Sequence, residues 1–142
     1  MNKSSPSYTL YLSCSWYYDN TYKELLALLD LIKEFRYEIR TLPVDITRSS
    51  RNKGRRRYQR IKNVMDNSDA LLVLGGVYPL YQDLLGKEIM ACKNNQSKPL
   101  IVIKREAERQ ISPVVSQYAD RIVEWRAEDI IKTIRELIPG NA

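Results

Sequence analysis

Five short apolar segments alternate along this chain with segments whose apolar residues recur at helical spacing. The apolar segments fit β-strands, and the intervening segments fit helices that bury one face. Strict alternation predicts a parallel sheet with helices on both faces, because successive parallel strands must be joined by a crossover. We therefore expect an α/β fold with a five-stranded parallel sheet in the flavodoxin-like order 2-1-3-4-5.

The same patterns predict where each element begins and ends. The expected strands are Tyr8–Ser13, Tyr37–Val44, Ala70–Gly75, Pro99–Ile103 and Arg121–Trp125. The expected helices are Tyr22–Phe35, Arg57–Asn67, Leu80–Asn94, Ser112–Ala119 and Glu128–Ile138. The second strand is the more polar and is expected at a sheet edge. No linker or repeat divides the 142 residues, so we expect one domain over residues 1–142, with a flexible N-terminus at 1–7.

Composition removes several classes of chemistry. The chain contains no histidine, which excludes Ser-His-Asp and Cys-His catalysis and the commonest metal ligand. Its two cysteines, Cys14 and Cys92, form no C-x-x-C pair, so neither a disulfide framework nor a metal site is expected. No apolar stretch is long enough for a membrane span, and no signal peptide is recognisable. We expect a cytoplasmic protein without a membrane partner.

A sheet of this order binds ligands between the carboxyl ends of its first and third strands, which are residues 13–18 and 75–78 here. The chain has no P-loop and no G-x-G-x-x-G, and its third strand ends in Leu74-Gly75-Gly76 where a receiver domain needs an aspartate. Hydroxyl and aromatic groups with one acid remain at this crevice. The candidate residues are Ser13, Ser15, Trp16, Tyr17, Tyr78 and, on the following helix, Glu88.

Such a set suits a nucleotide. Aromatic faces stack on bases, small residues let backbone N–H groups approach phosphates, and a carboxylate stabilises the oxocarbenium-like charge formed when a glycosidic bond breaks. A glycine inside the expected helix, Gly86, hints at a close approach near Glu88. Each candidate also has a plain structural alternative: Glu88 as a helix-surface residue, the aromatics as core or rim, the serines as turn residues and the cysteines as small buried fillers.

The net charge of +6 is concentrated in one segment. Residues 46–65 hold eight basic residues and no acidic one, which leaves 15 basic against 17 acidic residues elsewhere. The protein is therefore a near-neutral domain with one basic segment, centred on Arg55, Arg56 and Arg57. Such a run is most often a solvated loop and helix face. Nucleic-acid binding through Arg48–Lys62 is an unfavoured alternative, because Tyr58 is its one aromatic residue.

Several segments resemble TIR domains. Tyr11-Leu-Ser-Cys-Ser15 resembles the first-strand box of these domains, and Asp83-Leu-Leu-Gly-Lys-Glu-Ile89 resembles the helix motif that carries the catalytic glutamate of their NAD-cleaving members. The runs 68–78, 98–103 and 121–125 are more similar still to the bacterial TIR-like family that includes ThsB of Thoeris anti-phage defence. Leu84 stands where an aromatic residue often precedes the glutamate by four positions.

The resemblance implies a TIR-like fold and an enzyme that cleaves NAD, releases nicotinamide and makes a cyclic or modified ADP-ribose signal. NAD is then a substrate, and no cofactor is expected. The catalytic residue is Glu88 by this resemblance. Ser13 and Ser15 fall on the box that lines the nicotinamide-ribose pocket, with Tyr78 beside it. Implied partners are a separate effector that responds to the product, a phage-derived trigger and other TIR domains in self-association.

A second hypothesis belongs to a different class. The chain is then a non-enzymatic TIR-like interaction or sensor module that acts through its basic loop at Arg55, Arg56 and Arg57. The two hypotheses differ in whether Glu88 or the arginines are needed for function.

Overall fold

The computed structural model describes residues 7–17, 20–41, 55–76, 82–94, 97–105 and 110–139. Its sheet has five parallel strands in the order β2-β1-β3-β4-β5, which confirms the expected topology and the edge position of the second strand. The strands are β1 (Ser7–Leu12), β2 (Arg36–Arg40), β3 (Ala70–Leu74), β4 (Leu100–Lys104) and β5 (Arg121–Glu124).

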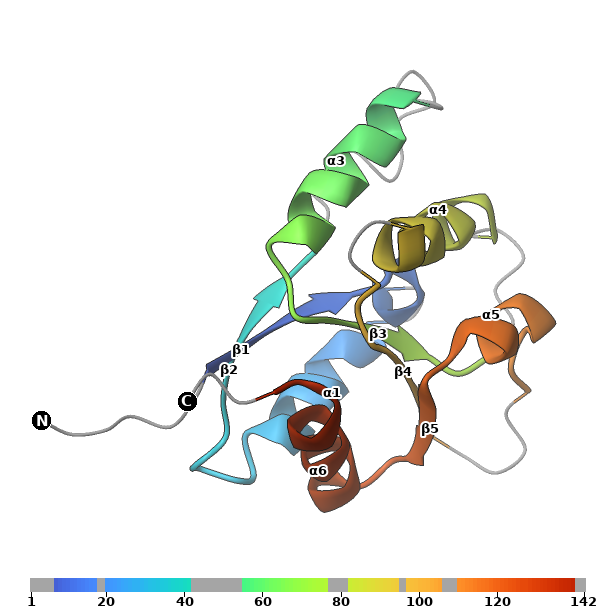
Figure 1. The fold of residues 1–142 in the computed structure, drawn as a ribbon. Coiled ribbons are helices and arrows are strands. Elements are labelled where there is room, and N and C mark those ends of the chain that lie inside the picture. The colour runs from blue at the N-terminus through green and yellow to red at the C-terminus, as the bar shows by residue number, and fades with distance from the viewer. Residues whose placement is uncertain are drawn as a thin grey trace, which may run out of the picture.

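Helices cover both faces of the sheet. Figure 1 shows α1 and α6 on one face, and α3 and α4 on the other. The bounds are η1 (Cys14–Tyr17, a 3-10 helix), α1 (Thr21–Leu29), α3 (Arg55–Asp66), α4 (Gln82–Asn94), α5 (Pro113–Tyr118) and α6 (Ala127–Leu137).

The central strands are apolar on both faces because both faces are covered. All five residues of β3 are buried. Leu72 and Leu74 pack in the core under α1 and α6, whereas Leu71 and Val73 pack in the core under α3 and α4. This alternation follows from the two-residue period of a strand, and it divides the interior into two apolar layers.

Two expected boundaries were wrong. The second strand ends at Arg40 rather than Val44, although residues 42–44 lie outside the described ranges. The first helix ends at Leu29, because the chain then makes successive tight turns, one of them closed by the Phe35 N–H on the Ile32 carbonyl at 3.1 Å. These turns bring the Phe35 ring onto the ring of Tyr8, with centroids 5.5 Å apart. Phe35 therefore joins the core from a loop.

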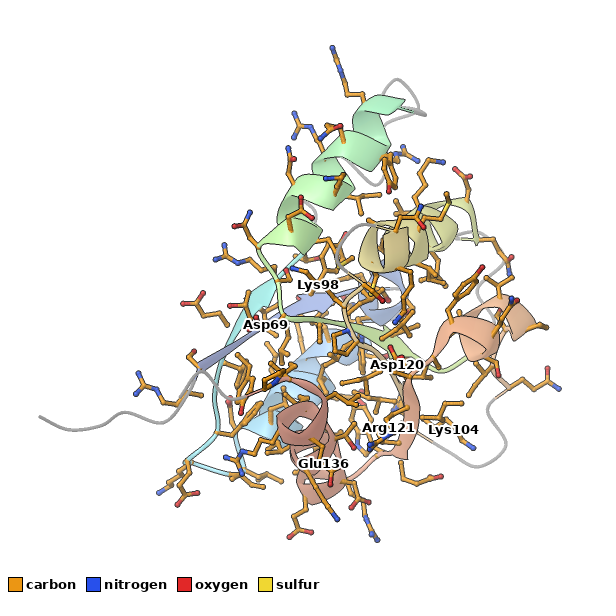
Figure 2. The ribbon with its side chains drawn as sticks, viewed as in Figure 1. Asp69, Lys98, Lys104, Asp120, Arg121 and Glu136 are labelled. Atoms are coloured by element: carbon orange, nitrogen blue, oxygen red, sulfur yellow. The ribbon has the colours of Figure 1, made fainter. Side chains whose placement is uncertain are left out.

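One lysine binds the carboxyl end of α3 at the amino edge of the sheet. The Lys98 ammonium donates hydrogen bonds to the carbonyls of Met65 (2.9 Å), Asp66 (3.0 Å) and Ser68, at the carboxyl end of α3. Figure 2 shows Lys98 at this edge, below the last turn of α3. The last carbonyls of a helix have no partner within the helix, and a cation is favoured there. Lys98 therefore caps α3 and attaches it to the start of β4.

Two aspartates complete this edge. The Asp69 carboxylate accepts the Thr9 N–H at 2.8 Å, which links the start of β3 to β1. The Asp120 carboxylate accepts the Leu100 N–H at 2.7 Å and pairs with the Lys93 ammonium. Strand starts expose backbone N–H groups, so acceptors at these positions satisfy them and fix the register of neighbouring strands.

Two negative findings concern the described ranges. No helix there is both long enough and apolar enough to cross a membrane. In the same ranges there is no group of three or more histidine, cysteine, aspartate or glutamate side chains that could hold a metal ion.

The close approach expected at Gly86 is wrong. Among the described residues, a Cβ atom added to this glycine would meet no atom within 4 Å apart from those of its chain neighbours and of the backbone of its own helix. Gly86 instead borders a shallow hollow between α4 and α5, whose other lining residues include Met90, Val114 and Tyr118.

We expect Gly86→Ala to raise the free energy of unfolding by up to about 1 kcal/mol, because alanine is the better helix former and its methyl group meets open space. Urea denaturation measures this change. Gly76→Ala is the contrasting variant: Gly76 has φ 149°, a conformation strained for alanine, so this variant should lose stability. A loss of stability in Gly86→Ala would contradict the open environment.

Candidate active site

Glu88 lies on the buried face of α4. It is 1% exposed, and its neighbours one turn away, Leu84 and Leu85, are also buried. This placement excludes the alternative in which Glu88 is an ordinary helix-surface residue. A buried carboxylate is costly unless it is hydrogen-bonded, so its partners define the site.

The end of β1 and the start of η1 supply those partners. The Tyr11 hydroxyl donates to Glu88 Oε2 at 3.0 Å, and the Cys14 N–H donates to Glu88 Oε1 at 3.1 Å. Tyr11 is completely buried and Cys14 nearly so. Each carboxylate oxygen therefore has a donor of its own, contributed by a segment more than 70 residues earlier in the chain.

Burial dominates the acid–base behaviour of this group. Loss of water raises the pKa of Glu88 from 4.5 to about 7, and the hydrogen bonds from the Cys14 N–H and the Tyr11 hydroxyl only partly offset that rise. Burial, reinforced by the Glu88 charge, also raises the pKa of the Cys14 thiol far above its ordinary value. Cys14 therefore stays a neutral thiol and is no candidate nucleophile.

Ser13 and Ser15 lie beside this group but face the end of β3. Both are completely buried, and their hydroxyl groups share a hydrogen bond. The Ser13 N–H donates to the Leu72 carbonyl at 3.0 Å, and the Ser15 Oγ accepts the Leu74 N–H at 3.0 Å. These bonds fasten η1 to β3 and thereby hold the Cys14 N–H in place.

The two aromatic residues of η1 lie in different surroundings. Trp16 is completely buried in the core under α1 and α6, where its indole N–H donates to the Leu72 carbonyl at 2.9 Å. Tyr17 is half-buried, with its ring centroid 4.5 Å from that of Tyr22. Burial chiefly raises the pKa of Tyr17, a hydrogen bond with Thr41 lowers it, and Tyr22 and the Glu88 charge add smaller rises. Tyr17 is therefore a half-buried ring on which Glu88 has a small electrostatic effect, whereas Trp16 lies in the core under α1 and α6.

The remaining predicted site residues fall elsewhere. Tyr78 lies outside the described residues. Arg55, Arg56 and Arg57 begin α3, where Arg56 is exposed and Arg57 is half-buried. Figure 1 shows this end of α3 extending beyond the sheet, so the arginines form a feature separate from Glu88.

Sequence reasoning missed the two donors to Glu88. The sequence patterns place Tyr11 in the first-strand box and indicate that Cys14 is a small buried residue. Neither pattern indicates a hydrogen bond to Glu88. One signal was available, since a tyrosine inside a fully buried strand needs a hydrogen-bond partner for its hydroxyl. The Cys14 donor is a backbone N–H, which no side-chain pattern can reveal.

Glu88→Gln tests the ionisation of this group through stability. A folded-state pKa near 7 lies above the unfolded value, so Glu88 destabilises the fold progressively as pH rises through about 7. We expect Glu88→Gln to be more stable than the parent by roughly 3 kcal/mol at pH 8 and to lose that advantage towards pH 4.5. Urea denaturation across this range measures the difference, and a constant difference would show that Glu88 does not titrate there.

Comparisons with known proteins agree with the fold. A pilus assembly-related protein from Burkholderia pseudomallei K96243 is similar over 100% of this chain and 98% of its own, with 13% identity and a TM-score of 0.52. The pilus assembly protein CpaE from Caulobacter crescentus CB15 matches 97% of this chain and 98% of its own, with 10% identity and a TM-score of 0.49. No protein with a curated description matches the sequence.

A family model gives a more specific match. The model describes the TIR-like domain of the Thoeris protein ThsB, and it matches residues 13–110. This range includes η1, the basic end of α3 and the α4 glutamate. Because the match covers more than half of the sequence, this chain belongs to the family of ThsB TIR-like domains.

Proposed function

We propose that this protein cleaves NAD at the bond between nicotinamide and ribose, with Glu88 as the catalytic residue. The observation that carries the proposal is a buried carboxylate on α4, held by the carboxyl end of β1 in a member of a TIR-like family. Its position matches the motif that carries the glutamate of NAD-cleaving TIR domains. Open α/β sheets bind their ligands at this edge.

Cleavage of the bond between nicotinamide and ribose needs a negative charge close to the ribose and few other catalytic groups. When the C1′–N bond breaks, its electron pair stays on the pyridine nitrogen, so nicotinamide leaves as a neutral molecule. The ribose is left as an oxocarbenium cation, which an ionised Glu88 stabilises electrostatically. Attack by water, with loss of its proton, gives ADP-ribose, whereas attack by another nucleophile of the same molecule gives a cyclic product.

Access to Glu88 needs a change of arrangement. With 1% of its surface exposed, its carboxylate faces Tyr11 and Cys14 rather than solvent. A substrate ribose can reach the carboxylate only if the packing around it opens on a side away from Tyr11 and Cys14. This arrangement suits an enzyme that is switched on by a phage-derived trigger or by self-association, and whose ADP-ribose-type product activates a separate effector in anti-phage defence.

The substrate-binding roles divide according to burial. The Ser13, Ser15 and Trp16 side chains already bond to protein groups, so we assign them to the support of η1. Tyr17 is the described aromatic residue that remains half-exposed beside Glu88 and is our candidate for stacking on a substrate ring.

The decisive experiment measures nicotinamide release from NAD by mass spectrometry, at high protein concentration and in lysate of phage-infected cells. We expect the parent protein to release nicotinamide and Glu88→Gln to be slower by about 100-fold or more, since one electrostatic group is removed. Asp83→Asn is the matched control, because it removes an exposed carboxylate from the same helix. Full activity in Glu88→Gln would refute the site assignment.

The basic face of α3 supports a second candidate function, that of an interaction module. Arg56 and Arg60 are exposed one turn apart, and within the described residues neither forms an ion pair. Their end of α3 extends from the body of the molecule (Figure 1). Unpaired cations on a projecting helix suit an acidic partner surface, on another TIR domain or on a phage component.

Arg56→Glu/Arg60→Glu should weaken association through this face by at least tenfold, because each substitution replaces attraction with repulsion. Analytical ultracentrifugation at low and high salt measures self-association, and binding to fractionated phage proteins measures sensing. Lys33→Glu/Lys132→Glu makes the same charge change elsewhere on the exposed surface. Equal behaviour of the two variants would remove α3 as the interface. No binding of single-stranded or duplex nucleic acid is expected.

A further inference from the structure

Tyr11 places a single polar atom in an apolar layer. Its ring packs in the core under α3 and α4, together with Leu71 and Ile89, and the side chain is completely buried. The hydroxyl is bonded to Glu88 Oε2 at 3.0 Å. A phenylalanine would fill the same space without leaving a polar group there, so packing alone does not require the hydroxyl.

The two donors to Glu88 differ in what they can do. The Cys14 N–H, at 3.1 Å from Oε1, can only donate. The Tyr11 hydroxyl can donate to a carboxylate, or rotate and accept from a protonated carboxyl group. Its bond is stronger in the first case, because the acceptor then carries a charge. The hydroxyl therefore favours the ionised form and fixes the direction of Oε2.

We propose that Tyr11 is a positioning residue for the cleavage reaction, which aims the Glu88 carboxylate and keeps it ionised. This inference rests on the proposed function of Glu88. The family match begins at residue 13 and leaves Tyr11 outside, so the role of Tyr11 is argued from its contact with Glu88. The residue acts through Glu88 and does not itself contact the ribose.

The surroundings of Glu88 leave this task to few groups. Within the described ranges, the titratable groups that face it are Tyr11 from β1 and Cys14 and Tyr17 from η1. Among the residues that the structure describes, no lysine or arginine pairs with Glu88. Burial, with the Glu88 charge added, raises the pKa of Tyr11 well above its ordinary value, so Tyr11 stays a protonated donor. The ionised carboxylate thus depends on hydrogen bonds from the Tyr11 hydroxyl, the Cys14 N–H and the Cys14 thiol.

The first test is the pH profile of nicotinamide release by Tyr11→Phe. Without the hydroxyl, the pKa of Glu88 should rise, and the acidic limb of the profile should move up by about one pH unit. Activity at pH 7 should fall roughly fivefold and recover near pH 9, where Glu88 is ionised in both proteins. Tyr8→Phe is the matched control, because it removes a hydroxyl from the same strand on the opposite face; its profile should equal that of the parent.

The second test does not depend on turnover. The pH dependence of the unfolding free energy is measured for the parent, Glu88→Gln, Tyr11→Phe and the double variant. The change in unfolding free energy caused by Glu88→Gln reports the ionisation of Glu88, once with Tyr11 present and once in the Tyr11→Phe background. The pH at which this change stops growing should lie about one pH unit higher in the Tyr11→Phe background, because that upper limit is set by the folded-state pKa of Glu88.

The two tests separate the possible failures. A uniform loss of activity at every pH, or an unmoved upper limit in the stability measurement, would overturn the role of Tyr11. A moved upper limit, together with a parent protein that releases no nicotinamide under any condition, would overturn the proposed function, and with it the part that Tyr11 plays in the reaction. The coupling of Tyr11 to the ionisation of Glu88 would then still be established.

Discussion

A carboxylate buried between a helix and a sheet needs a donor for each of its oxygens, and this requirement organises the carboxyl edge of the fold. Tyr11 and the Cys14 N–H meet it for Glu88. The position of the Cys14 N–H depends on η1 being held against β3 by Ser13 and Ser15, whose hydrogen bonds reach Leu72 and Leu74. The serines thus contribute to the site indirectly, through the backbone that they hold.

The two apolar layers separate the functions of the η1 aromatics. Trp16 turns away from α4 and fills the layer under α1 and α6, where its ring centroid lies 6.2 Å from that of Trp125. Tyr17 stays at the rim and within electrostatic reach of Glu88. A 3-10 helix therefore supplies both an anchor for one core and a half-buried aromatic ring at the carboxyl edge of the sheet. The first residue of η1, Cys14, belongs to the other layer, so η1 bridges the two faces of the sheet at its carboxyl end.

The sequence carried the topology because strand and helix periods alternate without interruption, and because apolar runs such as Ala70–Leu74 fit only the centre of a covered sheet. It also pointed to Glu88 through spacing and resemblance, but it left the burial of that residue open, since a helix pattern does not say which face meets the sheet. The Tyr11 contact spans 77 positions, and the Cys14 donor is backbone; local patterns contain neither. The first helix was expected to end at Phe35 because apolar residues continue at helical spacing up to that position. Phe35 packs in the core although the helix has already ended, so its spacing does not mark the helix end.

The Lys98 cap makes α3 an asymmetric helix. Its carboxyl end is bonded to the body by three carbonyl contacts, whereas its amino end begins with three consecutive arginines and has no acidic residue in the first turn to oppose the dipole. Fraying is therefore easier at the arginines than further along α3, where Ile61 and Met65 are buried in the core. The amide protons of the basic end should exchange with solvent well before those near Lys98.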